Sequence, residues 1–246
     1  MKEIIYGRNP VIEWLNAALP VSRIFIAKDT HGGAVQKILT LASERHIPVL
    51  HVLRAKVDEI TGEQYRHQGV AAEIKVPGYA SIDDILKNSE RRGEPPLVAI
   101  LDGVQDPHNL GAILRSAEGA GIHGVIIPKD KAVGITPVVV KASAGAAAYL
   151  PIVQVTNLVR TMAELKDNGF WFIGVDESGE KSYDQADFQG PIGLVFGSEG
   201  KGLRRLVRKN CDFVISIPMY GKVASLNVSV AAALIFFQAR RQREKN

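Results

Sequence analysis

Polar side chains able to do chemistry stand just after three apolar, strand-like segments of the chain. The first pair, Asn109 and Arg115, follows LVAILDGV in the stretch DGVQDPHNLGAILRSAEGAG. Glu199 lies between glycines in GSEGKGL after IGLVFG, and Ser225 and Asn227 lie in MYGKVASLNVSVAAAL after FVISIP. Ligands of open α/β sheets bind outside the carboxyl ends of the strands, so we expect these groups to converge on one site.

The residue types present exclude several common kinds of enzyme site. The glycines of GSEGKGL fit neither G-x-G-x-x-G nor G-x-x-x-x-G-K-[ST], which disfavours dinucleotide and nucleoside-triphosphate sites. No serine triad or paired-carboxylate pattern occurs, and His108 is an isolated loop histidine of the kind that is more often structural than catalytic. The single cysteine, Cys211, permits neither a disulfide framework nor a multi-cysteine zinc site. We therefore expect a structural thiol, a reducing compartment and no metal.

Each candidate residue also has an ordinary structural role open to it. Asn109 and Asn227 are of a type that caps helix N-termini, and Arg115 can pair with Glu118 three residues further along the same helix. The glycines around Glu199 can make a simple turn. These roles leave the DGVQDPHN loop unexplained.

The positive charge of the chain is concentrated near its C-terminus. Residues 1–200 carry 20 Lys and Arg against 24 Asp and Glu, whereas residues 201–246 carry 10 against 2. The excess lies in KGLRRLVRKN, in Lys222 and in the tail ARRQREKN. Such clustering is typical of a surface that meets phosphate, and equally of a solvated helix face with a basic tail, so charge alone leaves both open.

The elements that must position these residues fall into two parts. Residues 1–75 alternate helical and extended patterns and predict a small α/β domain, with strands at VSRIFIA and PVLHVL. Residues 76–96 are polar with Pro and Gly at both ends, which predicts a linker with room for one short helix. Residues 97–246 hold the apolar strands LVAILDGV, GVIIP, FWFIGV, IGLVFG and FVISIP with helices between them, which predicts an open α/β sheet.

The N-terminal residues MKEIIYGRNP carry charges and no long apolar run. This pattern argues against a signal peptide and against a membrane span. We therefore expect a cytoplasmic protein without a membrane partner.

Three segments, taken together and in order, resemble a known family. DPHNLGAILRSAEGAG, GLVFGSEGKGL and ISIPMYGKVASLNVSVAAAL are similar to the three motifs of the SpoU class of SPOUT RNA ribose methyltransferases. IYGRNPVIEWL and HQGVAAEI resemble the small L30e-like, RNA-binding domain that precedes the catalytic domain in members acting on guanosine in 23S rRNA. The resemblance implies a SPOUT sheet tied in a deep trefoil knot, one of the rare exceptions to unknotted folds.

The resemblance also implies a cofactor and a set of site residues. The cofactor would be S-adenosylmethionine, held in a bent form by Gly197, Ile217 and Leu226, with Pro218 and Met219 beside them. Asn109, Arg115, Glu199, Ser225 and Asn227 match the polar positions of the family motifs. Asn109 and Glu199 would orient Arg115, and Ser225 and Asn227 would support the loop and the target ribose.

The implied reaction is methyl transfer to a ribose 2′-hydroxyl. A guanidinium stays protonated in proteins, so Arg115 is expected to hold a substrate phosphate and stabilise the developing oxyanion, while a phosphate oxygen or Glu199 accepts the proton. The implied partners are 23S rRNA and a second copy of the chain, with SVAAALIFFQARR as one apolar contact helix. Two alternatives remain: the same chemistry on tRNA or another rRNA site, and an RNA-binding or ribosome assembly protein without catalytic activity.

RNA contacts are expected at two places, the basic segment from Lys201 to Lys209 and the N-terminal domain. In that domain Arg8, Asn9, His67 and Gln68 can contact RNA or serve only as caps and turns. Among the hypotheses, the complete set of motif residues favours the enzyme.

Overall fold

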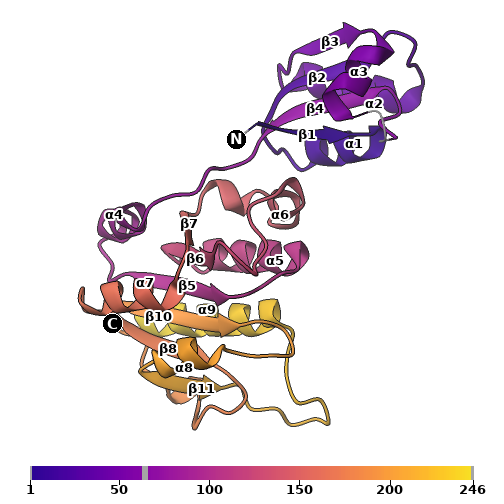
Figure 1. Cartoon of the computed structure of the whole chain (residues 1–246). Helices are drawn as coiled ribbons and strands as arrows, with labels where there is room; N and C mark the ends of the chain where they lie inside the picture. The colour runs from indigo at the N-terminus through magenta and orange to yellow at the C-terminus, as the bar shows by residue number, and fades with distance from the viewer. Residues whose placement is uncertain (1, 63–65, 245–246) are drawn as a thin grey trace. The chain divides into compact units, whose positions relative to one another are not determined.

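The computed structural model describes residues 2–62 and 66–244, and the chain packs as two units, Met1–Pro77 and Gly78–Asn246. Figure 1 shows the order of the elements in each unit. Each unit has its own sheet and its own apolar core. Each is therefore described by itself.

The first unit is a four-stranded sheet in the order β1-β4-β2-β3 with three helices. Strand β4 is antiparallel to both β1 and β2, and β2 is parallel to β3. The elements are β1 (Lys2–Tyr6), α1 (Arg8–Asn16), β2 (Val21–Ala27), α2 (Gly33–Glu44), β3 (Val49–Val52), α3 (Arg54–Thr61) and β4 (Val70–Lys75).

Alternation along β2 gives the first unit two apolar layers. Ile24 and Ile26 face the side that α1 and α2 cover, where Val11 and Ile38 are buried. Phe25 faces the other side and packs with residues of α3. A strand buried on both faces needs apolar residues at successive positions, which accounts for the run IFIA.

The second unit contains seven parallel strands in the order β7-β6-β5-β10-β8-β11-β9. Its principal elements are α4 (Ile82–Arg92), β5 (Leu97–Asp102), α5 (Pro107–Gly119), β6 (Gly124–Pro128), α6 (Pro137–Ala142), β7 (Ile152–Val155), α7 (Leu158–Lys166), β8 (Trp171–Val175), β9 (Lys181–Ser182), β10 (Ile192–Gly197), α8 (Arg205–Lys209), β11 (Phe213–Ser216) and α9 (Val228–Arg243), with two 3₁₀ turns at Ala146–Ala148 and Tyr183–Gln185.

Helices cover both faces of this sheet. Side chains of α4, α7 and α8 pack with Val98, Phe172 and Val195 on one face. Helices α5, α6 and α9 pack together on the other face, where Phe236 meets Phe196 of β10 edge to face at 5.4 Å. Residues 97–102 are buried throughout, as expected for the middle of a parallel sheet.

The segment expected as a linker over residues 76–96 is mostly part of the second unit. Helix α4 begins with a capping box, in which Ser81 and Asp84 satisfy each other's backbone N–H groups, and it ends at Gly93 in the left-handed conformation. Ile85 is buried in the core of the second unit. The sequence of this segment is mostly polar because α4 presents only a narrow apolar stripe to the sheet.

No helix among the described residues is long and apolar enough to cross a membrane. Within the same part of the chain, no group of three or more His, Cys, Asp and Glu side chains is arranged to hold a metal ion.

Candidate active site

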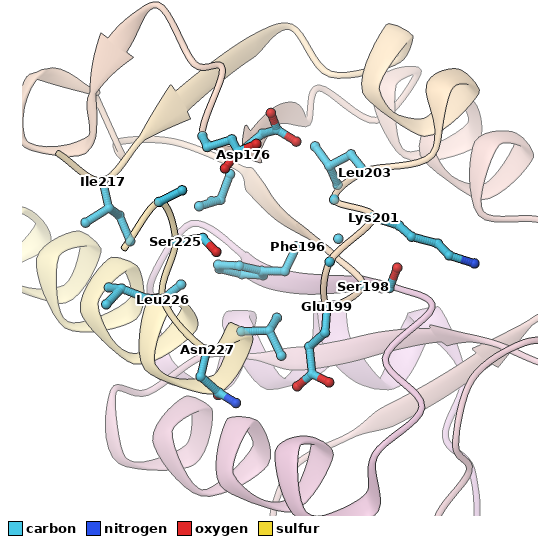
Figure 2. Close-up of a pocket in the computed structure, with 18 of the residues that line it drawn as sticks. Asp176, Phe196, Ser198, Glu199, Lys201, Leu203, Ile217, Ser225, Leu226 and Asn227 are labelled. Atoms are coloured by element: carbon cyan, nitrogen blue, oxygen red, sulfur yellow. The ribbon is translucent and has the colours of Figure 1, made fainter. Parts of the chain in front are cut away.

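A cavity of about 670 Å³ lies at the carboxyl ends of β8, β10 and β11. Its walls come from three segments far apart in the sequence: the end of β8, the loop after β10, and the loop that leads from β11 into α9 (Figure 2). Apolar walls include Phe196, Leu203, Ile217 and Leu226. This is the place where parallel α/β sheets bind ligands.

The GSEGKGL segment forms a tight hairpin that overhangs the cavity. Ser198 and Gly202 exchange two backbone hydrogen bonds of 3.1 and 3.0 Å, which places Glu199 at the tip. Any Cβ on Gly197 would overlap the backbone of Gly202, so glycine is required where the hairpin folds back onto β10. The base of the hairpin is held by Asp102, whose buried carboxylate accepts from the backbone N–H and the Nε of Arg204 at 2.8 and 2.5 Å.

Asn109, Glu199 and Asn227 form one hydrogen-bond network at the rim of the cavity. The Nδ2 of Asn109 donates to a carboxylate oxygen of Glu199, and the Nδ2 of Asn227 donates to Oδ1 of Asn109 at 3.1 Å. Figure 2 shows the Glu199 and Asn227 side chains on the same side of the cavity. Residues from all three motifs therefore meet, joined through the amide of Asn109.

Of the two asparagines that could cap a helix, Asn227 does so and Asn109 does not. Asn227 caps α9 through a 2.8 Å bond from the backbone N–H of Ser229. Asn109 is not a cap, because Asp106 takes that position at the start of α5. Asn109 instead lies in the first turn of the helix and is buried, with its side chain committed to the network.

Arg115 is not brought to this network within one chain. It is exposed on α5 and makes no hydrogen bond or ion pair with the described residues, so the pairing with Glu118 that the sequence allowed does not form. Six residues at about 100° each place Arg115 roughly 120° around the helix from Asn109. Its guanidinium is free for a phosphate or for a second protein chain.

The residues predicted to hold a cofactor gather at the cavity with one difference. Gly197, Ile217, Met219 and Leu226 line it, whereas Pro218 is exposed and does not. Ser225 also lines the cavity beside the cap of α9. The cavity therefore combines apolar side chains with backbone groups of three loops, a lining suited to a nucleoside.

Sequence reasoning did not assign Asp176 to any site, and it placed Arg208 in the basic segment expected to contact RNA, not on the cavity wall. They form an ion pair of 2.8 Å. Asp176 directly follows the predicted strand FWFIGV, so the rule that chemistry follows strand ends could have found it. Nothing in the sequence pairs Arg208 with it.

Two residues weighed in the sequence have no part in this site. His108 is exposed, and its side chain makes no hydrogen bond with the described residues. Cys211 is half-buried, and burial together with Asp212 raises the pKa of its thiol to about 12. A thiol that stays protonated at neutral pH is a poor nucleophile, which agrees with a structural role.

Two family patterns together cover nearly the whole chain. The SpoU rRNA methylase family matches residues 96–237. The family described as RNA 2′-O ribose methyltransferase substrate binding matches residues 4–80.

Individual relatives agree in length as well as in sequence. The chain is 44% identical over 242 residues to the putative TrmH family tRNA/rRNA methyltransferase YacO of Bacillus subtilis, covering 98% of this chain and 96% of that protein. It is 43% identical over 247 residues to the 23S rRNA (guanosine-2′-O-)-methyltransferase RlmB of Pseudomonas putida, covering 98% and 97%.

A solved structure supports the fold. The SpoU methyltransferase AviRb of Streptomyces viridochromogenes, determined in complex with AdoMet, superimposes with a TM-score of 0.70 at 25% identity and covers 100% of this chain and 92% of that chain. The fold class expected from the sequence, a SPOUT α/β domain after a small α/β domain, is confirmed, and the trefoil knot stays a prediction. The chain belongs to the SpoU family of RNA methyltransferases.

Proposed function

We propose that this chain transfers a methyl group from S-adenosylmethionine to the 2′-hydroxyl of a guanosine ribose in 23S rRNA. The observation that carries the proposal is the network in which Asn109, Glu199 and Asn227 meet at the rim of a cavity with room for a nucleoside. The likeness to RlmB of Pseudomonas putida, named as a guanosine-2′-O-methyltransferase, supports the choice of target.

The lining of the cavity fits the proposed cofactor. Gly197, Ile217, Met219 and Leu226 would hold the nucleoside between backbone groups and apolar side chains, with Pro218 supporting the loop from outside. When bound, S-adenosylmethionine supplies a methyl group on a sulfonium, which is an excellent leaving group. The protein therefore has to align the hydroxyl and help to remove its proton.

The polar residues divide this work between them. Arg115 binds a phosphate of the target nucleotide and stabilises the negative charge that develops on the 2′-oxygen. Glu199 or a substrate phosphate oxygen accepts the proton. Asn109 fixes Glu199, and Asn227 with Ser225 supports the loop beside the ribose.

Because Arg115 lies away from the network of its own chain, we propose that the site is completed by a second copy. On α9 the side chains of Val230, Leu234 and Phe237 are exposed at 48, 40 and 54%. Their spacing of four and three residues makes one apolar stripe. A Cβ on Gly119 would lie 3.9 Å from Phe237, and Gly119 is one turn beyond Arg115 on α5. Burial of this stripe in a two-fold dimer would place Arg115 at the interface.

Mixed dimers test this arrangement. Arg115→Ala and Glu199→Ala are each expected to be inactive as homodimers. Co-expressed with two different tags, they form heterodimers in which one site has both groups, so an equal mixture should recover about one quarter of the wild-type turnover. Recovery near zero would place Arg115 and Glu199 in the same chain's site.

Substrate RNA would be positioned by both units. The first unit belongs to a substrate-binding family, and Arg8 lies at its loop edge, where it donates through Nε to the backbone oxygen of Gln68 at 3.3 Å. His67 there is structural, since it binds Asp58 and accepts from the backbone N–H of Gly69. In the second unit, Lys201 lines the cavity. Action on ribosomal RNA would place the protein in the cytoplasm, which stays a prediction.

The deciding experiment measures labelled methyl transfer from S-adenosylmethionine into 23S rRNA and tRNA transcripts, followed by mapping of the modified nucleotide. A 2′-O-methylguanosine in 23S rRNA is the expected product. Methylation of tRNA instead, which the name of the Bacillus relative leaves open, would move the target but keep the chemistry. Cofactor binding without transfer to any RNA would favour a binding or assembly protein.

A further inference from the structure

Asp176 is a carboxylate on the cavity wall that takes no part in the proposed methyl transfer. Asp176 follows directly after β8, which lies between β10 and β11 in the sheet. Figure 2 shows Asp176 across the cavity from Glu199 and Asn227. The neighbouring strands end at Gly197 and Ser216, so Asp176 sits between the two loops proposed to hold a nucleoside.

The two oxygens of this carboxylate differ in their contacts. Oδ1 accepts from the backbone N–H and the hydroxyl of Ser178 and from Nη1 of Arg208, at 2.8 Å for the last. Oδ2 accepts no hydrogen bond from the described residues. A Cβ on Gly202, whose φ is +61°, would lie 2.8 Å from Oδ2, so glycine keeps this oxygen uncovered.

A purely structural carboxylate in the same unit looks different. Asp102 uses both oxygens, one for the backbone N–H and one for the Nε of Arg204, and it does not line the cavity. Asp176 is also largely removed from solvent, with 13% of its side chain exposed. Oδ2 is not sealed from solvent but opens onto the cavity, so a ligand hydroxyl can donate to it in place of water.

The carboxylate is charged at neutral pH. Burial raises the pKa of Asp176, but hydrogen bonds from Ser178 and Arg208 outweigh it and hold the pKa below its ordinary value. Oδ2 is therefore an anionic acceptor on the wall of a cavity with room for a nucleoside. The donors that a nucleoside carries in a pair are its two vicinal ribose hydroxyls.

We infer that Oδ2 of Asp176 accepts hydrogen bonds from the ribose hydroxyls of the cofactor. Asp176 is thus a cofactor-binding residue outside the family motifs, fixed in place by Ser178 and Arg208. This inference rests on the pocket assigned in the proposed function.

Calorimetric titration of the full-length protein tests the inference without any methyl transfer. The probes are S-adenosylhomocysteine, its 2′,3′-dideoxy analogue, and 5′-methylthioadenosine, which keeps the diol but lacks the amino-acid end. Asp176→Ala should weaken S-adenosylhomocysteine and 5′-methylthioadenosine by about 10- to 100-fold. It should leave the already weak dideoxy analogue unchanged within about twofold. Glu180→Gln, at an exposed carboxylate of the same loop outside the cavity lining, should change no affinity more than about twofold.

Asp176→Asn is a second variant that should preserve the fold, because the amide oxygen can still accept a hydrogen bond from Arg208. It should lose affinity for the two ligands that carry the ribose diol and not for the dideoxy analogue. Equal losses for all three probes would overturn the inference in favour of a structural role. Loss for S-adenosylhomocysteine but not for 5′-methylthioadenosine would assign Asp176 to the amino-acid end and overturn it too. Failure of the unchanged protein to bind S-adenosylhomocysteine would overturn the proposed function itself and this inference with it.

Discussion

The two edges of the second sheet carry the same kinds of polar side chain but use them differently. At the carboxyl edge, Asn109, Glu199 and Asn227 bond mainly to one another, and Arg115 bonds to no described residue. At the amino edge, the guanidinium groups of Arg240 and Arg243 in α9 each donate several hydrogen bonds within the chain. The first edge keeps donors and acceptors for a ligand, whereas the arginines of the second are bonded within the described part of the chain, and Nε2 of His123 is a buried atom there without a hydrogen-bond partner.

Backbone carbonyl oxygens accept most of the hydrogen bonds that Arg240 and Arg243 donate. Arg240 donates to the carbonyl oxygens of Ala120 and Gly121 at 2.9 and 3.0 Å, and through Nη1 to both oxygens of Glu94 at 3.0 Å. Arg243 donates to the carbonyl oxygens of Pro95, Phe188 and Gly190. These bonds tie the last helix to loops that precede β5, β6 and β10.

The charge pattern of the basic C-terminal region left both a surface for phosphate and a solvated helix face open, and the contacts show a third use for several of its arginines. Arg204 and Arg208 are paired with Asp102 and Asp176, and Arg240 and Arg243 anchor α9. Lys201 and Lys222 make no such bond with described residues, while Lys245 and Asn246 lie outside the described part of the chain. Much of the positive charge is therefore structural.

The largest effect expected at the carboxyl edge is on turnover. Arg115→Ala should lower kcat by roughly 10² to 10³-fold or more, because a charge that stabilises the oxyanion is lost. The free energy of unfolding should change by less than about 0.5 kcal/mol, since Arg115 is exposed and has no partner among described residues. Binding of S-adenosylhomocysteine should not change. Methyl transfer, urea unfolding and calorimetric titration measure these three quantities.

Arg160→Ala is the matched control, since Arg160 is an exposed helical arginine paired only with Glu164 on α7. It should change neither kcat nor stability. Loss of S-adenosylhomocysteine binding together with turnover in Arg115→Ala would show that Arg115 serves the cofactor instead of the RNA.

The amino edge should show the opposite pattern. Arg240→Ala removes the hydrogen-bond donor to two carbonyl oxygens and to the carboxylate of Glu94. Water can replace the arginine at only some of these acceptors. The free energy of unfolding should therefore fall by about 2 kcal/mol. The kcat of the folded fraction should stay unchanged. Arg241→Ala removes an exposed neighbour bonded only to Gln238 and should cost less than about 0.5 kcal/mol. Equal losses in urea unfolding would refute the anchoring role.

The sequence predicted the elements of both units better than it predicted their contacts. Apolar runs such as LVAILD fix a buried strand, and the capping role that the sequence left open to Asn227 forms, because capping depends on neighbouring residues. The meeting of Asn109 with Glu199 joins residues 90 apart, and Arg240 with Glu94 joins residues 146 apart. Only the fold determines such pairs.

The same limit explains the two departures at the site. Residue type left a capping role open to Asn109, whereas Asp106 three residues earlier takes the cap because Pro107 fixes the first helical position. Arg115 was grouped with Asn109 by motif, but the helix turns it to another face. Local rules give the element, and tertiary packing decides which side chains share a cavity.

A smaller effect is expected at the amino edge, where the free energy of unfolding should depend on pH through His123. His123 is fully buried, its Nδ1 accepts from the backbone N–H of Leu97, and its Nε2 lies 3.6 Å from Glu94. Burial and the positive charge of Arg92 lower its pKa from 6.5 to about 4. Between these values the unfolded chain binds more protons than the folded chain. Stability should therefore fall as the pH is lowered from 6.5 toward 4, by up to about 1.4 kcal/mol per pH unit.

His123→Asn should remove this slope, whatever its own cost in stability, and urea unfolding at pH 7, 6 and 5 measures it. Glu94, whose pKa is lowered chiefly by its hydrogen bonds with Arg240, adds a loss in the same direction only below its ordinary value of 4.5. His108→Asn, at an exposed histidine of the same unit, should leave the slope unchanged. A slope that persists in His123→Asn would mean that another group titrates in this range.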